Sequence, residues 1–420
     1  MTTAPKLIQP IQQPFDIEIR LPGSKSIALR EMLIAALTQG LSQLTGVPIC
    51  DDVDAMTDAL RRLGVKVETD PSGRTLIDPS HMDWSSDVVL DARMSGVSLR
   101  LLCALAGLRA GTTHLIGHRS LAARPNNDLL NALVDLGCEV ESNGGKLPIK
   151  IKGPIQFNKV RLNVGTSSQY LSALLLIAPG LEQGLTIFLD GKLPSASYVG
   201  LTLASMLNHG VEVQDSQDQF KIQPTPYATG EFLVEGDASA MSYHAALATL
   251  HRSKVQVSNL GTRSLQGDVM FLKVCEQLGA TVSQTLDTTV IEGTELLQPL
   301  TEVDMFQMPD AATTLMGIAP YLPGPIRITG LDTLPKKECD RIACPARELT
   351  KAGIEVEYGN DYLSIKPGKP KATTFSTYDD HRMAMSFGVL ATATSGCAIE
   401  NPECVGKTYP QFWDDLERMY

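Results

Sequence analysis

Two kinds of apolar pattern alternate along the chain. In the first, an amphipathic stretch ends at a glycine and is followed by alternating apolar and polar residues, as in MTDALRRLGVKVE. Such a stretch is typical of a half-exposed helix, glycine suits the left-handed residue that ends many helices, and the alternation predicts a strand. The pattern recurs about every 70 residues. Its glycines are Gly64, Gly137, Gly210, Gly279 and Gly353.

The second pattern is a helix that is apolar on nearly every side, as in SKSIALREMLIAAL and DDHRMAMSFGVLA. A helix of this kind is buried. It also recurs about every 70 residues, in phase with the first pattern, so that six repeats account for the 420 residues. The positions that mark its start are Ser26, Ser98, Ser168, Ser239, Ala311 and Asp380.

A repeat of this size cannot bury both its apolar faces alone, so we expect three repeats to share one core. The pattern therefore predicts an α/β fold of six βαβαββ-like repeats, three in each of two lobes. We place the first lobe at residues 21–235 and the second at 236–420 together with 1–20. The chain ends in YPQFWDDLERMY, a surface helix with no strand after it. We expect FDIEIRLPG, near the N-terminus, to close that sixth repeat.

Composition narrows the class of protein. Hydrophobic residues make up 43% of the chain, a fraction typical of globular proteins. No stretch of about 18 residues is apolar throughout, so the sequence predicts no membrane-spanning helix. The N-terminus lacks the apolar segment of a secretory signal, and the eight cysteines form no CxxC pair. We therefore expect a cytoplasmic protein with reduced thiols, no metal site and no membrane partner. The net charge of −11 argues against a nucleic-acid partner but not against a small anionic substrate.

The expected buried helices begin with polar and basic residues that a core helix does not need. Helix N-termini present free N–H groups and a positive dipole end, so several of them aimed at one place would bind an anion. Plain N-capping is the alternative for each Ser or Asp, but it does not account for Lys25 or Arg382. Further basic residues lie in loops, and no Walker A or GxGxxG motif is present. These loop residues are Arg124, Lys337, Arg341 and Lys407.

Ordered motifs give the chain a family resemblance. They are LPGSKSIALR, SGVSLRLL, ARP at 123–125, SSQYLSALL, EGDASAMSY, QGD at 266–268, MPDAATTL, KKECDRI, YDDHRMAM and GKTYP. In this order they resemble the 5-enolpyruvylshikimate-3-phosphate synthases, the 3-phosphoshikimate 1-carboxyvinyltransferases, nearly end to end. The resemblance implies the two-lobed enolpyruvyl transferase fold, with the N-termini of the buried helices facing the cleft between the lobes. It also implies transfer of the enolpyruvyl group of phosphoenolpyruvate to the 5-hydroxyl of shikimate 3-phosphate, with release of phosphate, by a monomer without metal or cofactor.

The resemblance also implies roles for individual residues. For shikimate 3-phosphate the matching positions are Lys25, Ser26, Arg30, Ser167, Ser168, Gln169, Ser195, Tyr198, Asp310 and Lys337. For phosphoenolpyruvate they are Lys25, Gly96, Arg124, Gln169, Arg341, Arg382 and Lys407. The expected catalytic residues are Glu338, as the acid that protonates the methylene carbon, and Asp310 and Lys25, as candidates for activating the hydroxyl. An ordinary Glu is ionised at pH 7, so Glu338 needs a raised pKa or a proton relay.

The sequence departs from the family pattern at two loops. The usual Asn-x-Gly-Thr reads Met94-Ser95-Gly96-Val97, and Thr333 replaces an Asn before the KKECDR segment. Because of these changes, a carboxyvinyltransferase that acts on a different hydroxylated acceptor remains an alternative function. The same changes could alter inhibition by glyphosate, which competes with phosphoenolpyruvate in this family. The sister enzymes acting on UDP-N-acetylglucosamine use a loop cysteine that GTTHLIGHRSLAARP lacks. A catalytically silent binding protein is the remaining alternative, and the retained charged residues count against it.

Overall fold

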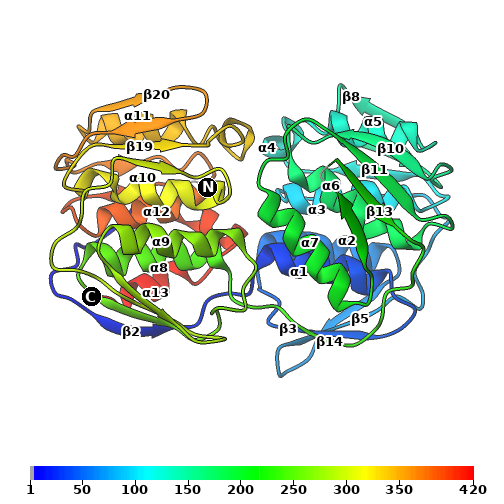
Figure 1. Cartoon of the computed structure of the whole chain (residues 1–420), viewed down its shortest axis with the longest axis horizontal. Helices are drawn as coiled ribbons and strands as arrows, with labels where there is room; N and C mark the ends of the chain where they lie inside the picture. Colours follow the sequence, from blue (N-terminus) through cyan, green and yellow to red (C-terminus); the bar gives the residue numbers. More distant parts are fainter. Residues whose placement is uncertain (1–3, 217) are drawn as a thin grey trace. The chain divides into compact units, whose positions relative to one another are not determined.

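The computed structural model describes residues 4–216 and 218–420, which form two compact units (Figure 1). One unit, called here the inserted unit, is Gly23–Val234. The other, called the terminal unit, combines the chain up to Pro22 with Glu235–Tyr420. The chain therefore passes from one unit to the other twice. The domain bounds expected from the sequence, with changes at residues 21 and 236, concern independently folding parts and stay a prediction.

Sheets of one design surround the core of the inserted unit. In each described sheet two parallel strands are followed by two antiparallel ones, and the strand orders are β14-β3-β5-β4, β6-β7-β9-β8 and β10-β11-β13-β12. The strands are β3 (Ser42–Thr45), β4 (Lys66–Thr69), β5 (Arg74–Asp78), β6 (Val88–Asp91), β7 (Thr113–Ile116), β8 (Glu139–Asn143), β9 (Lys146–Lys152), β10 (Lys159–Asn163), β11 (Leu185–Asp190), β12 (Val213–Ser216), β13 (Gln219–Ile222) and β14 (Glu231–Leu233).

Buried and half-exposed helices alternate in this unit, as the sequence predicts. The buried helices are α1 (Lys25–Ala36), α3 (Gly96–Ala106) and α6 (Ser168–Ile177), and they contact one another in the core. The short η1 (Ala178–Gly180) continues α6. The outer helices are α2 (Asp51–Arg62), α4 (Arg119–Ala122), α5 (Asn127–Asp135) and α7 (Ala196–Asn208).

The terminal unit repeats this design. Its sheets have the orders β16-β17-β15-β2, β18-β19-β21-β20 and, with three described strands, β1-β23-β22. The strands are β1 (Lys6–Leu7), β2 (Asp16–Ile19), β15 (Lys254–Val257), β16 (Thr281–Gln284), β17 (Thr289–Glu292), β18 (Glu302–Asp304), β19 (Ile326–Thr329), β20 (Val356–Tyr358), β21 (Leu363–Ile365), β22 (Thr374–Phe375) and β23 (Ala398–Ile399).

Three buried helices form the core of the terminal unit: α8 (Ala238–Leu250), α10 (Ala312–Ile318) and α12 (His381–Ala391). Figure 1 shows them lying one above another within this unit. The other helices are η2 (Gly267–Met270), α9 (Phe271–Gln277), η3 (Pro309–Ala311), η4 (Ala319–Tyr321), η5 (Leu334–Lys336), α11 (Ala343–Lys351), η6 (Pro402–Lys407) and α13 (Phe412–Glu417).

The glycines that end the outer helices behave as predicted. Gly64, Gly137, Gly210, Gly279 and Gly353 have φ values from 79° to 103°. This left-handed region is accessible to glycine without the Cβ clash that other residues suffer, which explains why the amphipathic pattern ends at glycine each time.

The prediction for the N-terminal strand is wrong. The FDIEIRLPG segment forms β2, which pairs in parallel with β15 rather than with the last repeat. The antiparallel partner in the sheet of β22 and β23 is instead β1, Lys6–Leu7. The strand preceding α1 in sequence thus lies in the terminal unit, and β14 takes its place beside β3. The segment of β2 alternates between polar and apolar residues, whereas β1 is two residues long and has no such pattern, so alternation alone could not single out β1 as the strand that closes the last sheet.

Among the described helices, none combines the length and the apolar character needed to span a lipid bilayer.

Two histidines of the terminal unit, the buried His244 and the half-buried His251, predict a loss of stability in acid. Burial lowers the pKa of His244 and of His251 to about 4. In the unfolded chain both imidazoles take up a proton near pH 6.5, whereas in the folded chain they do so only near pH 4. The free energy of unfolding should therefore fall as the pH drops from about 6.5 to 4. Each histidine contributes roughly 3 kcal/mol at most. Urea unfolding at several pH values should give a flatter profile for His244→Gln, and an unaltered one for the exposed His81→Gln. An equally steep profile in both variants would contradict the assignment.

Candidate functional site

In the inserted unit, Lys25 stands at the start of α1 and is held by Asp52. Its Nζ lies 2.9 Å from Asp52 Oδ2, and the Asp52 side chain is only 2% exposed. Asp52 is in the first turn of α2, where a carboxylate also interacts favourably with the helix dipole. Ser98 Oγ donates to the backbone oxygen of Asp52 at 3.1 Å, which ties α2 to α3. Lys25 is therefore a positioned cation rather than a mobile surface lysine.

Gly96 brings two arginines together at the start of α3. A Cβ built on Gly96 would collide with the guanidinium nitrogens of both Arg100 and Arg124. Arg100 donates to the Gly96 backbone oxygen at 2.9 Å and lies 3.4 Å from Gln169 Oε1. Asn126 donates to the Arg124 backbone oxygen at 3.1 Å, which fixes the loop that carries Arg124. Only glycine allows guanidinium groups to approach this backbone so closely.

The remaining predicted residues of the inserted unit form two further groups. Ser167 caps α6 by accepting from the Gln169 backbone N–H at 3.3 Å, so part of its role is the plain capping considered from the sequence. Arg30 donates to Thr202 Oγ1 at 2.8 Å and to the backbone oxygens of Ser26, at 2.6 Å, and Tyr198, at 3.1 Å. Burial lowers the pKa of Arg30 to about 10, so it stays charged at neutral pH.

Ser195 takes an unusual backbone conformation immediately before α7. Its φ of 50° and ψ of 50° place it in the left-handed region, and it is 7% exposed. A non-glycine residue here costs about 1–2 kcal/mol, which the surrounding packing must offset. Strain of this kind is concentrated at ligand-binding and catalytic positions, so it supports the hypothesis that Ser195 binds a ligand.

In the terminal unit, Asp310 on η3 is surrounded by cations. Its Oδ1 accepts from Lys337 Nζ at 3.2 Å and from Arg341 Nη1 at 3.1 Å, and its Oδ2 accepts from Arg382 Nη2 at 3.0 Å. Burial alone would raise the pKa of Asp310, but Arg382, Lys337 and Arg341 outweigh it and hold that pKa well below the ordinary value. Asp310 is therefore a carboxylate at neutral pH.

Arg341 joins this carboxylate to a second one. Its Nε and Nη2 donate to the two oxygens of Asp380, at 2.8 and 3.0 Å, in the bidentate geometry that arginine favours. Asp380 is fully buried and caps α12 by accepting from the Arg382 backbone N–H at 2.9 Å. Burial lowers the pKa of Arg341, but Asp380, Glu338 and Asp310 outweigh that effect, so the guanidinium remains charged.

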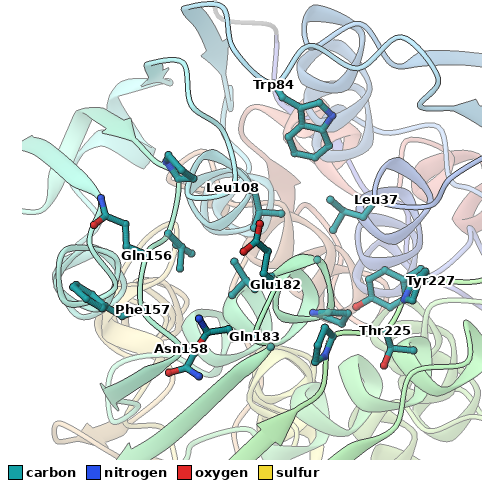
Figure 2. A pocket seen from close by; sticks show the side chains of 18 of the residues that line it. Leu37, Trp84, Leu108, Gln156, Phe157, Asn158, Glu182, Gln183, Thr225 and Tyr227 are labelled. Carbon is teal, nitrogen blue, oxygen red and sulfur yellow. The ribbon is translucent and has the colours of Figure 1, made fainter.

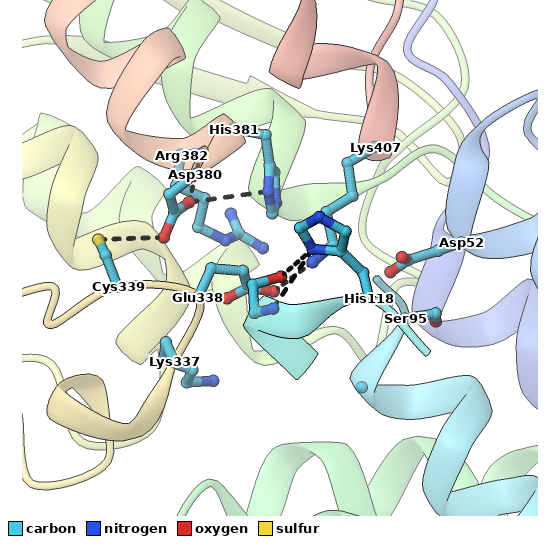
Figure 3. Close-up of polar contacts among 12 residues, drawn as sticks. Asp52, Ser95, His118, Lys337, Glu338, Cys339, Asp380, His381, Arg382 and Lys407 are labelled. Atoms are coloured by element: carbon cyan, nitrogen blue, oxygen red, sulfur yellow. Dashed lines mark hydrogen bonds and ion pairs between the residues drawn. The ribbon is translucent and has the colours of Figure 1, made fainter. Parts of the chain in front are cut away.

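Glu338 completes the network, as Figure 3 shows. Its Oε1 accepts from Lys407 Nζ at 2.7 Å, and its Oε2 accepts from Arg341 Nη2 at 2.8 Å. The Glu338 side chain is 13% exposed and that of Lys407 is 5% exposed. All the terminal-unit residues singled out from the sequence therefore belong to one connected set of charges. They are Asp310, Lys337, Glu338, Arg341, Arg382 and Lys407.

This hydrogen-bonded network contains four positively charged side chains and three carboxylates, those of Asp310, Glu338 and Asp380. The positive charges are therefore in excess. In a buried setting such charges interact strongly and are poorly screened by salt. An incoming anion with several charges would give the bases further acceptors. The arrangement can therefore bind a polyanion and can also supply carboxylates that accept or deliver protons.

Sequence reasoning did not select three charged residues that the structure adds. Asp52 and Arg100 are described above. The third is Asp268 on η2, which is buried and hydrogen-bonded to Ser239. Burial and then the nearby Asp310 raise the pKa of Asp268 to about 6. The sequence held a signal for two of these residues. Asp268 lies in the QGD motif, and Arg100 follows Gly96 by four residues on a helix that the pattern predicts to be buried. A charged residue at a buried helical position was the available signal for Arg100.

A strained turn leads into Asp380, and a buried carboxylate supports it. Tyr378 and Asp379 have successive φ values of 55° and 57°. Glu348 on α11 is 2% exposed and accepts from the Tyr378 hydroxyl at 2.7 Å and from the Ser376 backbone N–H at 3.0 Å. These two bonds hold the turn at Ser376, just before the strained residues, and at Tyr378, the first of them.

We expect Glu348→Gln to destabilise the folded protein by about 1–3 kcal/mol, because one amide oxygen must replace two carboxylate oxygens that accept from Ser376 and Tyr378, and the charge that pairs with Lys351 is lost. Chemical unfolding measures this change. Glu355→Gln is the matched control, since Glu355 pairs with Lys366 on the surface and its loss should cost less than about 1 kcal/mol. Equal effects in the two variants would show that the Glu348 contacts do not support the turn.

Among the described residues, no group of three or more His, Cys, Asp or Glu side chains is arranged to hold a metal ion.

Comparison with known proteins agrees with the resemblance. The sequence profile of the family described as EPSP synthase (3-phosphoshikimate 1-carboxyvinyltransferase) matches residues 10–416. A 3-phosphoshikimate 1-carboxyvinyltransferase 2 of Halalkalibacterium halodurans is 36% identical over 98% of this chain and 93% of its own length. The chloroplastic 3-phosphoshikimate 1-carboxyvinyltransferase of Arabidopsis thaliana is 37% identical over 98% of this chain and 84% of its own.

Solved structures agree on the fold. An EPSP synthase from Acinetobacter baumannii superposes with a TM-score of 0.81 at 22% identity, covering 99% of this chain and 98% of that one. The enolpyruvyl transferase NikO from Streptomyces tendae gives a TM-score of 0.77 at 16% identity, covering 99% and 97%. These identities are low, so the likeness establishes the α/β fold alone. The profile and the two relatives carry the assignment further, and by them this chain belongs to the EPSP synthase family.

Proposed function

We propose that the protein transfers the enolpyruvyl group of phosphoenolpyruvate to the 5-hydroxyl of shikimate 3-phosphate and releases phosphate. The observation that carries this proposal is the connected network of Asp310, Lys337, Glu338, Arg341, Arg382 and Lys407. Both substrates are multiply anionic, and arginine and lysine groups fixed in advance suit their phosphates and carboxylates. We further propose a cytoplasmic monomer that acts without metal or cofactor.

The reaction is an addition followed by an elimination. The acceptor hydroxyl loses its proton and attacks the central carbon of phosphoenolpyruvate, while the methylene carbon gains a proton. The tetrahedral intermediate then loses phosphate and a methyl proton to restore the double bond. Fixed cations stabilise the charge that develops in these steps, and they need no rearrangement as it forms.

In our proposal Glu338 delivers the proton to the methylene carbon. Its two oxygens accept hydrogen bonds from Lys407 and Arg341, which favour the charged carboxylate. Bound phosphoenolpyruvate competes for those same cations with its own charges. The carboxylate of Glu338 then loses positive partners and gains a negative neighbour, and both changes increase its affinity for a proton. Substrate binding thus prepares Glu338 to act as an acid.

Asp310 and Lys25 are the proposed groups that activate the acceptor hydroxyl. Asp310 is ionised and can accept a proton, but its three cations make it a weak base until substrates draw them away. Lys25 is fixed by Asp52 and would stabilise the alkoxide as a cation. The acceptor ligands proposed from the sequence are Lys25, Ser26, Arg30, Ser167, Ser168, Gln169, Ser195, Tyr198, Asp310 and Lys337. Those proposed for phosphoenolpyruvate are Lys25, Gly96, Arg124, Gln169, Arg341, Arg382 and Lys407.

The proposed function is tested by measuring phosphate release from phosphoenolpyruvate with shikimate 3-phosphate as the acceptor, and by identifying the enolpyruvyl product by mass spectrometry. We expect turnover that chelators do not reduce. Folded protein that shows no turnover with shikimate 3-phosphate would overturn the proposal. Turnover only with another hydroxylated ring acid would identify the alternative carboxyvinyltransferase, and binding without turnover would identify a silent binding protein.

The Gly96 loop predicts reduced sensitivity to glyphosate. Met94 and Val97 lack the amide and hydroxyl found in the family pattern, and each lost hydrogen bond weakens binding by about 0.5–1.5 kcal/mol, or more to a charged group. Restoring both with Met94→Asn and Val97→Thr should lower the inhibition constant by about tenfold. The inhibition constants of the natural protein and the double variant measure this directly. No change would mean that backbone groups and arginines alone determine inhibitor binding.

A further inference from the structure

A pocket of about 790 Å³ opens in the inserted unit (Figure 2). Its volume lies within the range of sites that accept small organic molecules. The walls come from the ends of α1, α3 and η1 and from the loops around Trp84, Phe157 and Thr225. None of its lining residues belongs to the groups proposed above for catalysis or substrate binding.

Three buried helices direct their carboxyl ends at this pocket. Leu37 is the C-cap residue of α1, Leu108 follows the C-cap of α3, and Pro179 and Gly180 lie in η1, which continues α6. The same helices begin beside Lys25, Gly96 and Ser168, and α1 is 12 residues long, so its two ends lie roughly 16 Å apart.

The charge of the pocket is negative. The aligned peptide dipoles of a helix place a partial negative charge at its carboxyl end, which remains although Tyr227 and Thr225 donate to the backbone oxygens of Leu176 and Pro179. Glu182 adds a full carboxylate, and none of the nineteen lining residues is Lys, Arg or His. Arg109, which is close to Trp84 in the fold, is turned away: it donates to the backbone oxygens of Asp83 and Ser86 and to Thr113 Oγ1. Such surroundings favour a cation and disfavour an anion.

Aromatic and proline side chains form much of the wall. Trp84 and Phe157 are 41% and 58% exposed, which is high for large apolar side chains. Tyr227 is buried and donates to the Leu176 backbone oxygen at 2.9 Å, so its ring is fixed. In the view of Figure 2, Glu182 lies between Trp84 and Phe157. Aromatic faces attract cations and pack well against flat rings.

From this geometry we propose that the pocket is a second ligand site, which binds a small organic cation with an aromatic body. The ring packs against Trp84 and the prolines, and the ammonium group is stabilised by Glu182 and the helix carboxyl ends. The proposal rests on the inserted unit alone and does not depend on the enolpyruvyl transfer reaction.

Tryptophan fluorescence gives a direct test, because the chain has two tryptophans and the other, Trp413, is only 8% exposed. The probe is 2-phenylethylammonium, and 2-phenylethanol and 3-phenylpropionate are its neutral and anionic counterparts. We expect a saturable change in Trp84 emission with the cation, at least about tenfold tighter binding of the cation than of the alcohol, and weaker binding still of the carboxylate. Equal binding of cation and alcohol, or no saturation by about 10 mM, would overturn the proposal.

Three variants locate the site. At Gly180 a Cβ would lie 3.7 Å from Leu108 Cδ1, an ordinary contact, so Gly180→Phe can fill the pocket without backbone strain and should weaken binding at least tenfold. Gly200→Phe is the matched control, since Gly200 is exposed and no neighbouring atom lies within 4 Å of its Cβ position. Glu182→Gln should weaken the cation about two- to fivefold and leave the alcohol unaffected. Binding that survives Gly180→Phe unchanged would place the cation elsewhere and refute the proposal.

Discussion

Replacing Glu338 with Gln should lower turnover by on the order of 10²-fold or more, because the variant cannot deliver a proton to the methylene carbon. The structure adds a second expectation. Glu338 now binds Lys407 at 2.7 Å and Arg341 at 2.8 Å, and an amide would hold both cations less tightly. Phosphoenolpyruvate would then meet less competition for them, so its KM should stay the same or fall. Steady-state kinetics with varied phosphoenolpyruvate measures both quantities.

The control for this variant is Glu295→Gln, which removes an exposed carboxylate that pairs with Arg252 on the surface. It should leave kcat and KM within about twofold, since surface ion pairs contribute little. A normal kcat in Glu338→Gln would show that another group protonates the substrate. A fall in kcat with a large rise in KM would instead show that Glu338 acts mainly in binding.

The fold was largely predictable because two periodic signals agreed. Buried helices such as α1 and α8 are apolar on all sides, and the glycines that end the outer helices need the left-handed region. Pairing between distant strands was not predictable in the same way. The segment Asp16–Ile19 pairs with Lys254–Val257, more than 230 residues away, whereas Lys6–Leu7 occupies the place that we assigned to it. A short alternating strand fits several sheets equally well.

The candidate site shows a similar division. Motifs single out Asp310, Glu338 and Arg341, and the structure connects them through shared hydrogen bonds. The supporting residues were harder to find. Asp52 resembles one more acidic residue at a helix start, and Glu348 resembles one more surface glutamate of an amphipathic helix. Their importance comes from burial and from partners distant in sequence, which the local pattern of a single sequence does not contain.

Asp310→Asn is the second change with a large expected effect. Asp310 accepts hydrogen bonds from Lys337, Arg341 and Arg382, and our proposal makes it a candidate base for the acceptor hydroxyl. We expect kcat to fall by about 10²–10⁴-fold, the range associated with a missing general base. The variant keeps the shape of the side chain but removes the negative charge of the carboxylate to which Lys337 and Arg382 both donate.

The same change should also strengthen the binding of simple anions, because three cations lose a carboxylate that occupies them. Titration with inorganic phosphate, followed by calorimetry, would detect tighter binding in Asp310→Asn than in the natural protein. Asp287→Asn is the control, since Asp287 is exposed and pairs only loosely with Arg263, at 3.5 Å. Turnover within about threefold of normal in Asp310→Asn would exclude Asp310 as the base and leave Lys25 as the group to test. Lost turnover with unchanged phosphate affinity would mean instead that the freed cations turn to Glu338 and Asp380, and that Asp310 does not restrain anion binding.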